Sequence, residues 1–299
     1  MNKNQIVSSE DVRRIWARLA AWRTDDPVVL AKKAVFFTLA LAVAVVFFFP
    51  FYWLLKVSLV WPPSALYGGT PNLALEEVSL FNFVRVFFQI DFLGFFWNSV
   101  VIAAVASSLG LLTNTLTAYA LTLEFRGKRI VQILLIAFLM IPYYLTLIPV
   151  FLITNELGLL NTRFGVALVL SVLVIGILVL KDSFDAVPDS LVDAARLDGA
   201  SELYIIFGVL YPVSRSAIAT NVILLFTVSW NAYLLPAVLI TEDSVQPLTM
   251  ALVNFRFTFQ ADFVAIYAFA IMVLAPITLV FLLLQRQFIK SVVLANIKG

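Results

Sequence analysis

The chain has 299 residues, of which 62% are hydrophobic and 13% are charged, and its mean hydropathy is +1.01. Soluble globular domains are about 45–50% apolar and about 25% charged, so this composition excludes a soluble protein, a disordered chain and a nucleic-acid-binding protein that depends on charge. Cysteine and histidine are absent, which excludes disulfide frameworks, thiolate metal sites and histidine acid–base chemistry. The sequence therefore predicts an integral membrane protein.

Six apolar stretches are long enough to cross a bilayer, which takes about 20 residues of helix. None of the six contains a charged residue, and the fourth is the shortest. They are 34–55, 99–121, 130–151, 164–180, 218–240 and 263–284. We therefore expect an all-α protein with six transmembrane helices.

The basic residues are sorted between alternate ends of these spans. Sixteen of the 20 Lys and Arg residues fall in 1–33, 126–129, 181–215 and 286–298. Cytoplasmic loops carry the excess of Lys and Arg in membrane proteins, so these four segments are predicted to face the cytoplasm. An even number of spans places both ends on the same side, and both termini are therefore predicted to be cytoplasmic.

The segment before the first span, 1–33, has one apolar face at helical spacing. The residues on this face are Val12, Ile15, Trp16 and Leu19. This pattern is typical of an amphipathic helix on the inner membrane face, and equally of a short helix packed on the bundle. A cleaved signal peptide is not expected, because no apolar core precedes residue 34. The remainder divides into 34–97, the first span with an outer loop, and 98–299, a five-helix core.

The motifs of catalysis and of self-powered transport are missing. The sequence Gly127-Lys128-Arg129 lacks the upstream glycine and the following Ser or Thr of a phosphate-binding loop. No carboxylate lies within a span, where ion-coupled carriers usually place one. We therefore expect neither an enzyme nor an ion-coupled carrier, and the energy for any transport would have to come from another subunit.

The cytoplasmic loop at 181–215 is far longer than a turn requires. Pro188 followed by Asp189 and Ser190 indicates the start of a helix, and Gly199 permits the positive φ that ends one. A helical apolar stripe then resumes and runs until Pro212. Its members are Leu203, Ile206, Phe207 and Leu210. The loop is therefore predicted to form two short helices at an angle, joined by a turn at 198–200.

Within this loop the residues Asp193-Ala-Ala-x-x-Asp198-Gly199-Ala200, followed by Pro212, resemble the EAA loop of binding-protein-dependent ABC importer permeases. The family usually has Glu where this chain has Asp193, and Leu where it has Tyr211. The wider chain is similar to the carbohydrate-uptake subfamily, and within it to the smaller permease of the maltose-importer type. This resemblance covers 98–299 and includes the stretches 158–162, 229–231, 284–286 and 297–299.

The resemblance implies that this loop is a coupling helix, which docks into a groove on an ATPase subunit. The residues it assigns to docking are Asp193, Ala194, Ala195, Asp198, Gly199 and Ala200. On composition alone an ordinary amphipathic surface helix explains the loop as well. The resemblance also implies that the tail 285–299 lies against the ATPase and that the outer loop 241–262 reaches toward a solute-binding protein.

Polar residues within the spans are candidates for a translocation path, because sugar hydroxyls need amide, hydroxyl and aromatic partners. The candidates are Asn114, Thr117, Ser229, Asn231 and Tyr233. Small and polar residues in membrane helices also serve helix–helix packing, and for each residue taken singly packing is the preferred interpretation.

Together these features imply a multi-pass plasma (inner) membrane permease subunit of an ATP-driven importer for a sugar or oligosaccharide. The implied partners are a homologous second permease, two ATPase subunits that bind ATP and Mg, and an external solute-binding protein. No cofactor, metal or nucleic acid is expected in this chain. Two alternatives stay open: the same architecture with a non-sugar solute such as glycerol phosphate, a polyol or an acidic oligosaccharide, and a non-transporting membrane scaffold.

Overall fold

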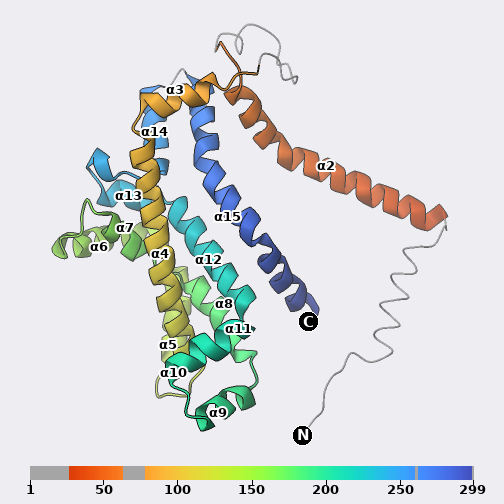
Figure 1. The fold of residues 1–299 in the computed structure, drawn as a ribbon, viewed down its shortest axis with the longest axis vertical. Coiled ribbons are helices and arrows are strands. Elements are labelled where there is room, and N and C mark those ends of the chain that lie inside the picture. The colour runs from red at the N-terminus through yellow and green to blue at the C-terminus, as the bar shows by residue number, and fades with distance from the viewer. Residues whose placement is uncertain (1–26, 63–77, 260–261, 298–299) are drawn as a thin grey trace. The chain divides into compact units, whose positions relative to one another are not determined.

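A computed structural model describes residues 27–62, 78–259 and 262–297, with the backbone alone at 284 and 286–297 (Figure 1). Within these ranges the elements are helices, and extended backbone pairs only in an isolated bridge between Val60 and Val78. The all-α prediction is confirmed. The amphipathic face predicted at residues 12–19 lies outside the described residues.

The chain divides into two units, Met1–Lys56 and Val57–Gly299. The described part of the first unit lies within helix α2, Pro27–Ser58, a 32-residue helix that contains Pro50. By length and hydropathy α2 can cross a membrane, and it corresponds to the first predicted span. Near its end Lys56 Nζ lies 5.4 Å from the ring centroid of Trp53.

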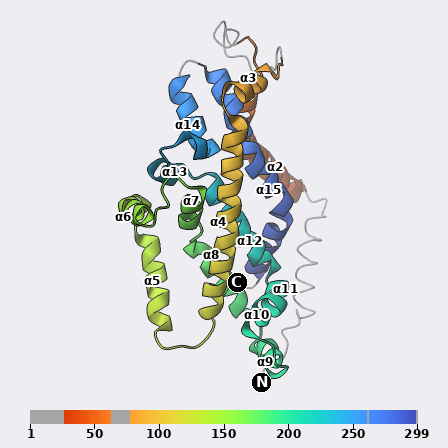
Figure 2. The same ribbon diagram turned by 60° about the vertical axis from the view of Figure 1, so that its left-hand side comes forward.

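The second unit is organised around α4 (Phe92–Ala120), α12 (Arg215–Trp230) and α15 (Phe263–Ile297). Helix α12 packs against both others, and α7 and α8 pack against α4 (Figures 1 and 2). The other helices, in chain order, are α3 (Phe81–Gln89), α5 (Lys128–Met140), α6 (Tyr143–Glu156), α7 (Arg163–Leu170), α8 (Val174–Asp185), α9 (Asp189–Leu197), α10 (Glu202–Tyr204), the π-helical η2 (Ile205–Leu210), α11 (Tyr211–Val213), α13 (Leu234–Leu239), the 3-10 helix η3 (Asp243–Val245) and α14 (Leu248–Thr258).

Three predicted spans are single helices long and apolar enough to cross a membrane: α2, α4 and the part of α15 at Phe263–Leu283. Three further crossings are possible where bent pairs act together. Helices α5 and α6 meet at 107°, α7 and α8 at 48°, and Glu202–Val213 meets α12 at 95°. By length and composition the described residues therefore allow up to six spans, and the count of six stays a prediction.

The stretches 130–151, 164–180 and 218–240 are interrupted, which corrects the expectation of one continuous helix in each. Pro142 has no amide hydrogen and disfavours helical backbone at the preceding residue, which is extended. The Ser171 hydroxyl donates to the carbonyl of Leu168 at 2.7 Å, which competes with the helical pattern. The side-chain Nδ2 of Asn231 likewise donates to the carbonyl of Thr227 at 3.0 Å, and α12 ends at the preceding residue, Trp230.

Three apolar clusters form the core of the second unit. The first surrounds Trp230 and Phe269, and the indole nitrogen of Trp230 donates to the carbonyl of Val273 at 3.0 Å, which joins α12 to α15. The second lies beside the loop at 186–214 and includes Leu180 and Ile205. The third joins α4, α7 and α13.

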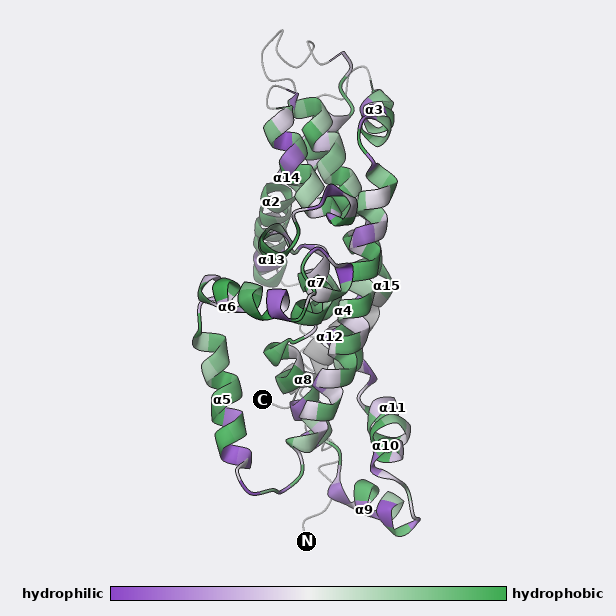
Figure 3. Cartoon of the chain, turned by 90° about the vertical axis from the view of Figure 1, so that its left-hand side faces the viewer, coloured by the Kyte–Doolittle hydropathy of each residue, from purple (hydrophilic) through white to green (hydrophobic). Residues whose placement is uncertain are grey.

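Many large apolar side chains remain exposed, as the composition requires. Helix α5 has no buried residue among those described, and its exposed side chains include Ile130, Leu134 and Met140. Figure 3 shows hydrophobic residues along α4, α5 and α6, and hydrophilic residues on α9. Such apolar faces are stable where lipid or another protein replaces water.

Candidate functional site

Helix α9 of the 181–215 loop begins and ends as the sequence predicts. Pro188 precedes its first residue, and Asp189 places a negative charge in the first turn, where the helix dipole favours it. At the other end Gly199 has φ +81°. The amide of Ala200 donates to the carbonyl of Ala195 at 3.0 Å, and that of Gly199 to Arg196 at 3.0 Å. This pair of bonds is the Schellman arrangement, which fixes a sharp turn at the end of a helix.

A second helical segment follows the turn. The Ser201 hydroxyl accepts from the amide of Tyr204 at 3.3 Å and caps α10, which continues through η2 into α11. The helical path ends at Val213, one residue after Pro212, and α12 leaves at the 95° bend. The prediction of two short helices joined by a turn at 198–200 is confirmed.

The residues assigned to docking do not all face outward. Asp193, Ala194, Asp198 and Gly199 are exposed. Ala195 and Ala200 are half-buried against the apolar cluster that includes Leu180 and Ile205, so these two alanines set the spacing of the loop on the bundle. No side chain among the nine residues of α9 is buried.

One exposed residue of this face escaped the sequence analysis. Leu197 is 89% exposed, the highest value among the large apolar side chains described. It lies on α9 beside Asp198, at a position whose exposure to water favours a polar side chain. A leucine placed off the apolar stripe of an acidic loop is the signal that could have identified it.

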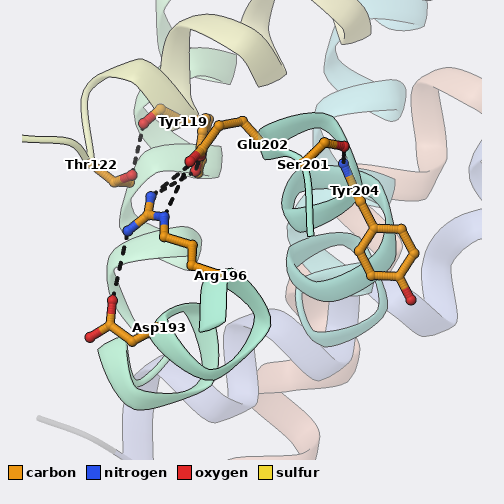
Figure 4. A network of polar contacts seen from close by, with 7 residues as sticks. All are labelled: Tyr119, Thr122, Asp193, Arg196, Ser201, Glu202 and Tyr204. Atoms are coloured by element: carbon orange, nitrogen blue, oxygen red, sulfur yellow. Dashed lines mark hydrogen bonds and ion pairs between the residues drawn. The ribbon is translucent and has the colours of Figure 1, made fainter. Parts of the chain in front are cut away.

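A polar network joins this loop to the end of α4 (Figure 4). Arg196 donates from Nε to Glu202 Oε1 at 3.2 Å and from Nη2 to Glu202 Oε2 at 3.3 Å. Its Nη2 also donates to the hydroxyl of Tyr119 at 3.1 Å, and that hydroxyl donates to Glu202 Oε2. Arg196 Nη1 lies 3.7 Å from Asp193 Oδ1.

This network keeps both charges in place. Hydrogen bonds from Arg196 and then Tyr119 lower the pKa of the Glu202 carboxyl below its usual value. The bonds that Arg196 donates, first to Glu202 and then to Tyr119, raise the pKa of Arg196. Sequence reasoning missed this network, because Tyr119 lies 77 residues from Arg196 and 83 from Glu202. In the sequence, only the opposite charges of Arg196 and Glu202 on either side of Gly199 indicated such a network.

The candidate path residues occupy different environments. Asn114 and Ser229 are buried, Thr117 is half-buried, and Asn231 and Tyr233 are exposed. The structure does not bring them together through any hydrogen bond among the described residues. Whether they line a path stays a prediction.

Asn114 instead joins three helices. Its Nδ2 donates to Asn221 Oδ1 at 3.2 Å, and Asn221 Nδ2 donates to the carbonyl of Gly176 at 2.8 Å. These bonds connect α4, α12 and α8, which is the packing role that polar residues often have in membrane helices.

A second polar cluster organises the loop at 240–247. Asn161, at φ +55°, accepts through Oδ1 from the amide of Thr241 at 2.6 Å and from that of Glu242 at 3.2 Å. Asn98 donates to the carbonyl of Gln246 at 2.9 Å and accepts from Arg163 Nε at 2.6 Å. Asn161, just before α7, and Asn98, on α4, therefore hold this loop in place.

The described residues contain no group of three or more Asp or Glu side chains that could hold a metal ion. Acidic residues of the loop at 186–214 instead pair with Arg196 or face solvent. The absence of a cofactor in this chain stays a prediction.

Comparisons with known proteins agree with the motif. Residues 110–293 match the family described as "Binding-protein-dependent transport system inner membrane component". The lactose transport system permease protein LacG of Rhizobium radiobacter is 30% identical over 247 residues, which cover 81% of this chain and 88% of that protein. The arabinooligosaccharides transport system permease protein AraQ of Halalkalibacterium halodurans is 30% identical over 248 residues, covering 81% of this chain and 84% of that protein.

The fold also matches a solved structure. A chain in the crystal structure of a bacterial ABC transporter involved in the import of the acidic polysaccharide alginate superposes with a TM-score of 0.77. The match covers 89% of this chain and 99% of that chain at 22% identity. The family model spans the loop at 181–215, α12 and most of α15, and the two relatives match over four fifths of the chain. The chain therefore belongs to the family of inner membrane components of binding-protein-dependent transport systems.

Proposed function

We propose that this chain is the transmembrane permease subunit of an ATP-driven importer for a sugar or oligosaccharide. The observation that carries the proposal is the family match together with relatives named as lactose and arabinooligosaccharide permeases. The chain provides a passage through the membrane and performs no covalent chemistry. It is therefore not an enzyme, and it acts by alternating access.

The loop at 181–215 is the coupling loop: it transmits the movement of the ATPase subunits on ATP binding to the membrane helices. Asp193, Ala194, Asp198 and Gly199 present a small, acidic, exposed surface, and Ala195 and Ala200 pack behind it. A short helix held by a Schellman turn transmits a rigid-body displacement when the ATPase subunits close. Leu197 adds an apolar contact to the same surface.

The remaining functions belong to partners. Two ATPase subunits bind ATP and Mg, an external solute-binding protein delivers the solute, and a homologous second permease completes the passage. The exposed apolar faces of α5 and α6 supply surface for that second permease and for lipid in the plasma (inner) membrane. This chain itself holds no cofactor.

The parts of the chain then have separate tasks. Segment 1–33 lies at the cytoplasmic membrane face, 34–97 supplies the first crossing and an outer loop, and 98–299 forms the permease core. The loop fixed by Asn161 and Asn98 faces the solute-binding protein, and the tail 285–299 lies along an ATPase subunit. Among the path candidates, Thr117, Asn231 and Tyr233 are the ones with exposed surface.

Reconstitution of the four-subunit complex in proteoliposomes tests the function. We expect ATP-dependent uptake of a labelled disaccharide or oligosaccharide that the solute-binding protein binds. Uptake of glycerol phosphate, a polyol or an acidic oligosaccharide alone would replace the sugar by one of those solutes. A chain that purifies without any ATPase subunit would instead indicate a membrane scaffold.

The variant Gly199→Trp tests the coupling assignment. A bulky residue in the turn should abolish the ATPase activity stimulated by the binding protein, while the complex still assembles. Gly127→Trp is the matched control, because Gly127 also has positive φ and, among the described residues, also has open space where a Cβ would stand. Normal stimulation in Gly199→Trp would overturn the assignment.

A further inference from the structure

In the described part of the chain, no neighbouring side chain packs against Gly199 in the turn. Among the described residues, no atom lies within 4 Å of the position where a Cβ would stand. Within α9, which precedes the turn, only Val192 and Ala195 pack half-buried against the apolar cluster that includes Leu180 and Ile205. Apolar packing therefore adds little to the two backbone bonds of the turn in fixing the angle of α9.

Arg196 and Glu202 bridge this turn from its two sides. Arg196 stands three residues before Gly199, and Glu202 three residues after it. The guanidinium contacts both carboxylate oxygens, at 3.2 Å and 3.3 Å. A two-pronged contact between two planar groups fixes their relative orientation as well as their separation.

Tyr119 ties this bridge to α4. Its ring is buried in the last turn of α4, and its hydroxyl emerges between the two charged groups (Figure 4). The hydroxyl donates to Glu202 and accepts from Arg196, so both of its hydrogen-bonding capacities are used. The carbonyl of Tyr119 accepts from the Thr122 hydroxyl at 2.7 Å, which fixes the end of the helix.

We propose that Arg196 and Glu202 clamp the Gly199 turn and that Tyr119 ties this clamp to α4, so that α9 and α4 move as one body. Helix α4 packs against α7, α8 and α12, and a displacement of α4 therefore reaches the centre of the second unit. The three side chains are positioning residues. The clamp is a feature of the fold, and its role in transport rests on the proposed function.

The angle of α9 can be measured directly, because the chain has no cysteine. Spin labels at Ser190→Cys on α9 and Ala120→Cys on α4 report the distance between the two helices in the assembled complex. Both positions are exposed. We expect one narrow distance distribution in the labelled parent, and a distribution at least twice as broad when Tyr119→Phe or Glu202→Gln is added.

The matched control is Tyr204→Phe. It also removes one phenolic hydroxyl from the loop, and the Tyr204 side chain points away from the network in Figure 4. Tyr204 is 61% exposed, whereas Tyr119 is 6% exposed. The clamp would be overturned if the distance distributions in Tyr119→Phe and Glu202→Gln were as narrow as that in Tyr204→Phe. Glu202 is exposed, so its replacement does not depend on repacking the core.

Transport gives the second readout. In proteoliposomes, Tyr119→Phe and Glu202→Gln should each lower the solute transported per ATP hydrolysed several-fold while leaving complex assembly intact. The double variant should be no worse than either single one, because both break one linkage. Unchanged coupling in both single variants would overturn the role in transmission.

The two proposals fail in different ways. If the parent complex transports no sugar, the proposed function is wrong, and the spin-label distances still decide the clamp. If the parent transports sugar and the variants keep narrow distances, the clamp alone is wrong.

Discussion

Gly176 lies where three helices approach so closely that a methyl group has no room. A Cβ at this position would stand 2.7 Å from the Nδ2 atoms of both Asn114 and Asn221. The carbonyl of Gly176 accepts from Asn221 in the same junction. Glycine therefore allows two asparagines from different helices to pair above the backbone of a third.

We predict that Gly176→Ala destabilises the chain by about 1–3 kcal/mol, the usual cost of an added methyl group in a packed core. The methyl group should separate α8 from α4 and α12 and break the bond between Asn114 and Asn221. Thermal unfolding of the purified complex in detergent measures the loss.

The comparison variant is Gly208→Ala. Its Cβ would meet the ring of Tyr204 at 3.0 Å, and an exposed ring can move aside. We expect a smaller loss of thermal stability there than in Gly176→Ala. Equal losses in the two variants would contradict the tight junction at Gly176.

The Glu202 carboxylate gives a prediction on pH. Because the bonds from Arg196 and Tyr119 lower its pKa, the folded chain holds this carboxylate ionised more firmly than the unfolded chain does. Its contribution to stability is therefore complete above the usual glutamate pKa of about 4.3 and is lost as the pH falls through the lowered value.

The spin-label distance between Ser190→Cys and Ala120→Cys should accordingly stay narrow from pH 8 to about pH 5, since that range lies above the glutamate pKa. In Glu202→Gln the distribution should be broad throughout the same range. Broadening of the parent between pH 8 and pH 6 would show that another group controls the angle.

Among the helices, hydropathy identifies the segments that are apolar enough to enter a membrane, but it does not predict where they break. The windows at 130–151 and 218–240 are mainly apolar and contain no charged residue, so composition predicts one helix in each. The interruptions depend on single residues, Pro142 and Asn231, whose effect on backbone hydrogen bonds is local. Proline in membrane helices is often accommodated as a kink, so its presence alone did not predict a break.

The local structure of the loop at 181–215 was predictable because the residues that determine it act locally. Pro188, Asp189 and Gly199 act within three or four residues of themselves, and the structure places the helix start and the turn where they indicate. The tie to Tyr119 was not predictable, because it joins segments 77 or more residues apart. Nothing in the spacing of α4 distinguishes Tyr119 from an ordinary tyrosine at a membrane interface.

The loop at 240–247 offers a further test. Asn161→Gly keeps the positive φ of this position but removes the Oδ1 atom that accepts from Thr241 and Glu242. Each lost bond is worth about 1 kcal/mol. We predict several-fold faster hydrogen exchange at the amides of these two residues.

Asn161→Asp is the matched control for this prediction. It keeps an acceptor oxygen at the same position and tolerates the left-handed backbone, so exchange should match the parent. Faster exchange in Asn161→Asp as well would show that the amide nitrogen, and not Oδ1, holds the loop.

The few charged side chains of the second unit and its apolar side chains stabilise different parts of the structure. Inside the described part of the second unit, charged contacts occur at the ends of helices: Arg85 pairs with Asp262 at the start of α15, and Arg196 pairs with Glu202 beside Gly199. The segments between these ends are apolar or carry paired amides such as Asn114 and Asn221. A chain with 13% charged residues thus uses charge to fix its loops, and apolar packing to hold its spans.

The distribution of basic residues leads to a prediction on topology. If the chain crosses the membrane six times with both ends inside, cysteines introduced as Asn2→Cys and Lys298→Cys should react with an impermeant maleimide only in inside-out vesicles. Glu242→Cys, in the exposed outer loop, should react only in intact cells or right-side-out vesicles. The chain has no cysteine, so each single variant reports one position without background.

The bent helix pairs make this measurement a test of whether the number of crossings is even. Helices α5 and α6 turn through 107°, so this pair can enter the membrane and return, or can cross it. A pair that returns would change the number of crossings by one and place the two ends of the chain on opposite sides. Labelling of Lys298→Cys from outside, with Asn2→Cys labelled from inside, would therefore reject six crossings and identify a re-entrant segment in their place.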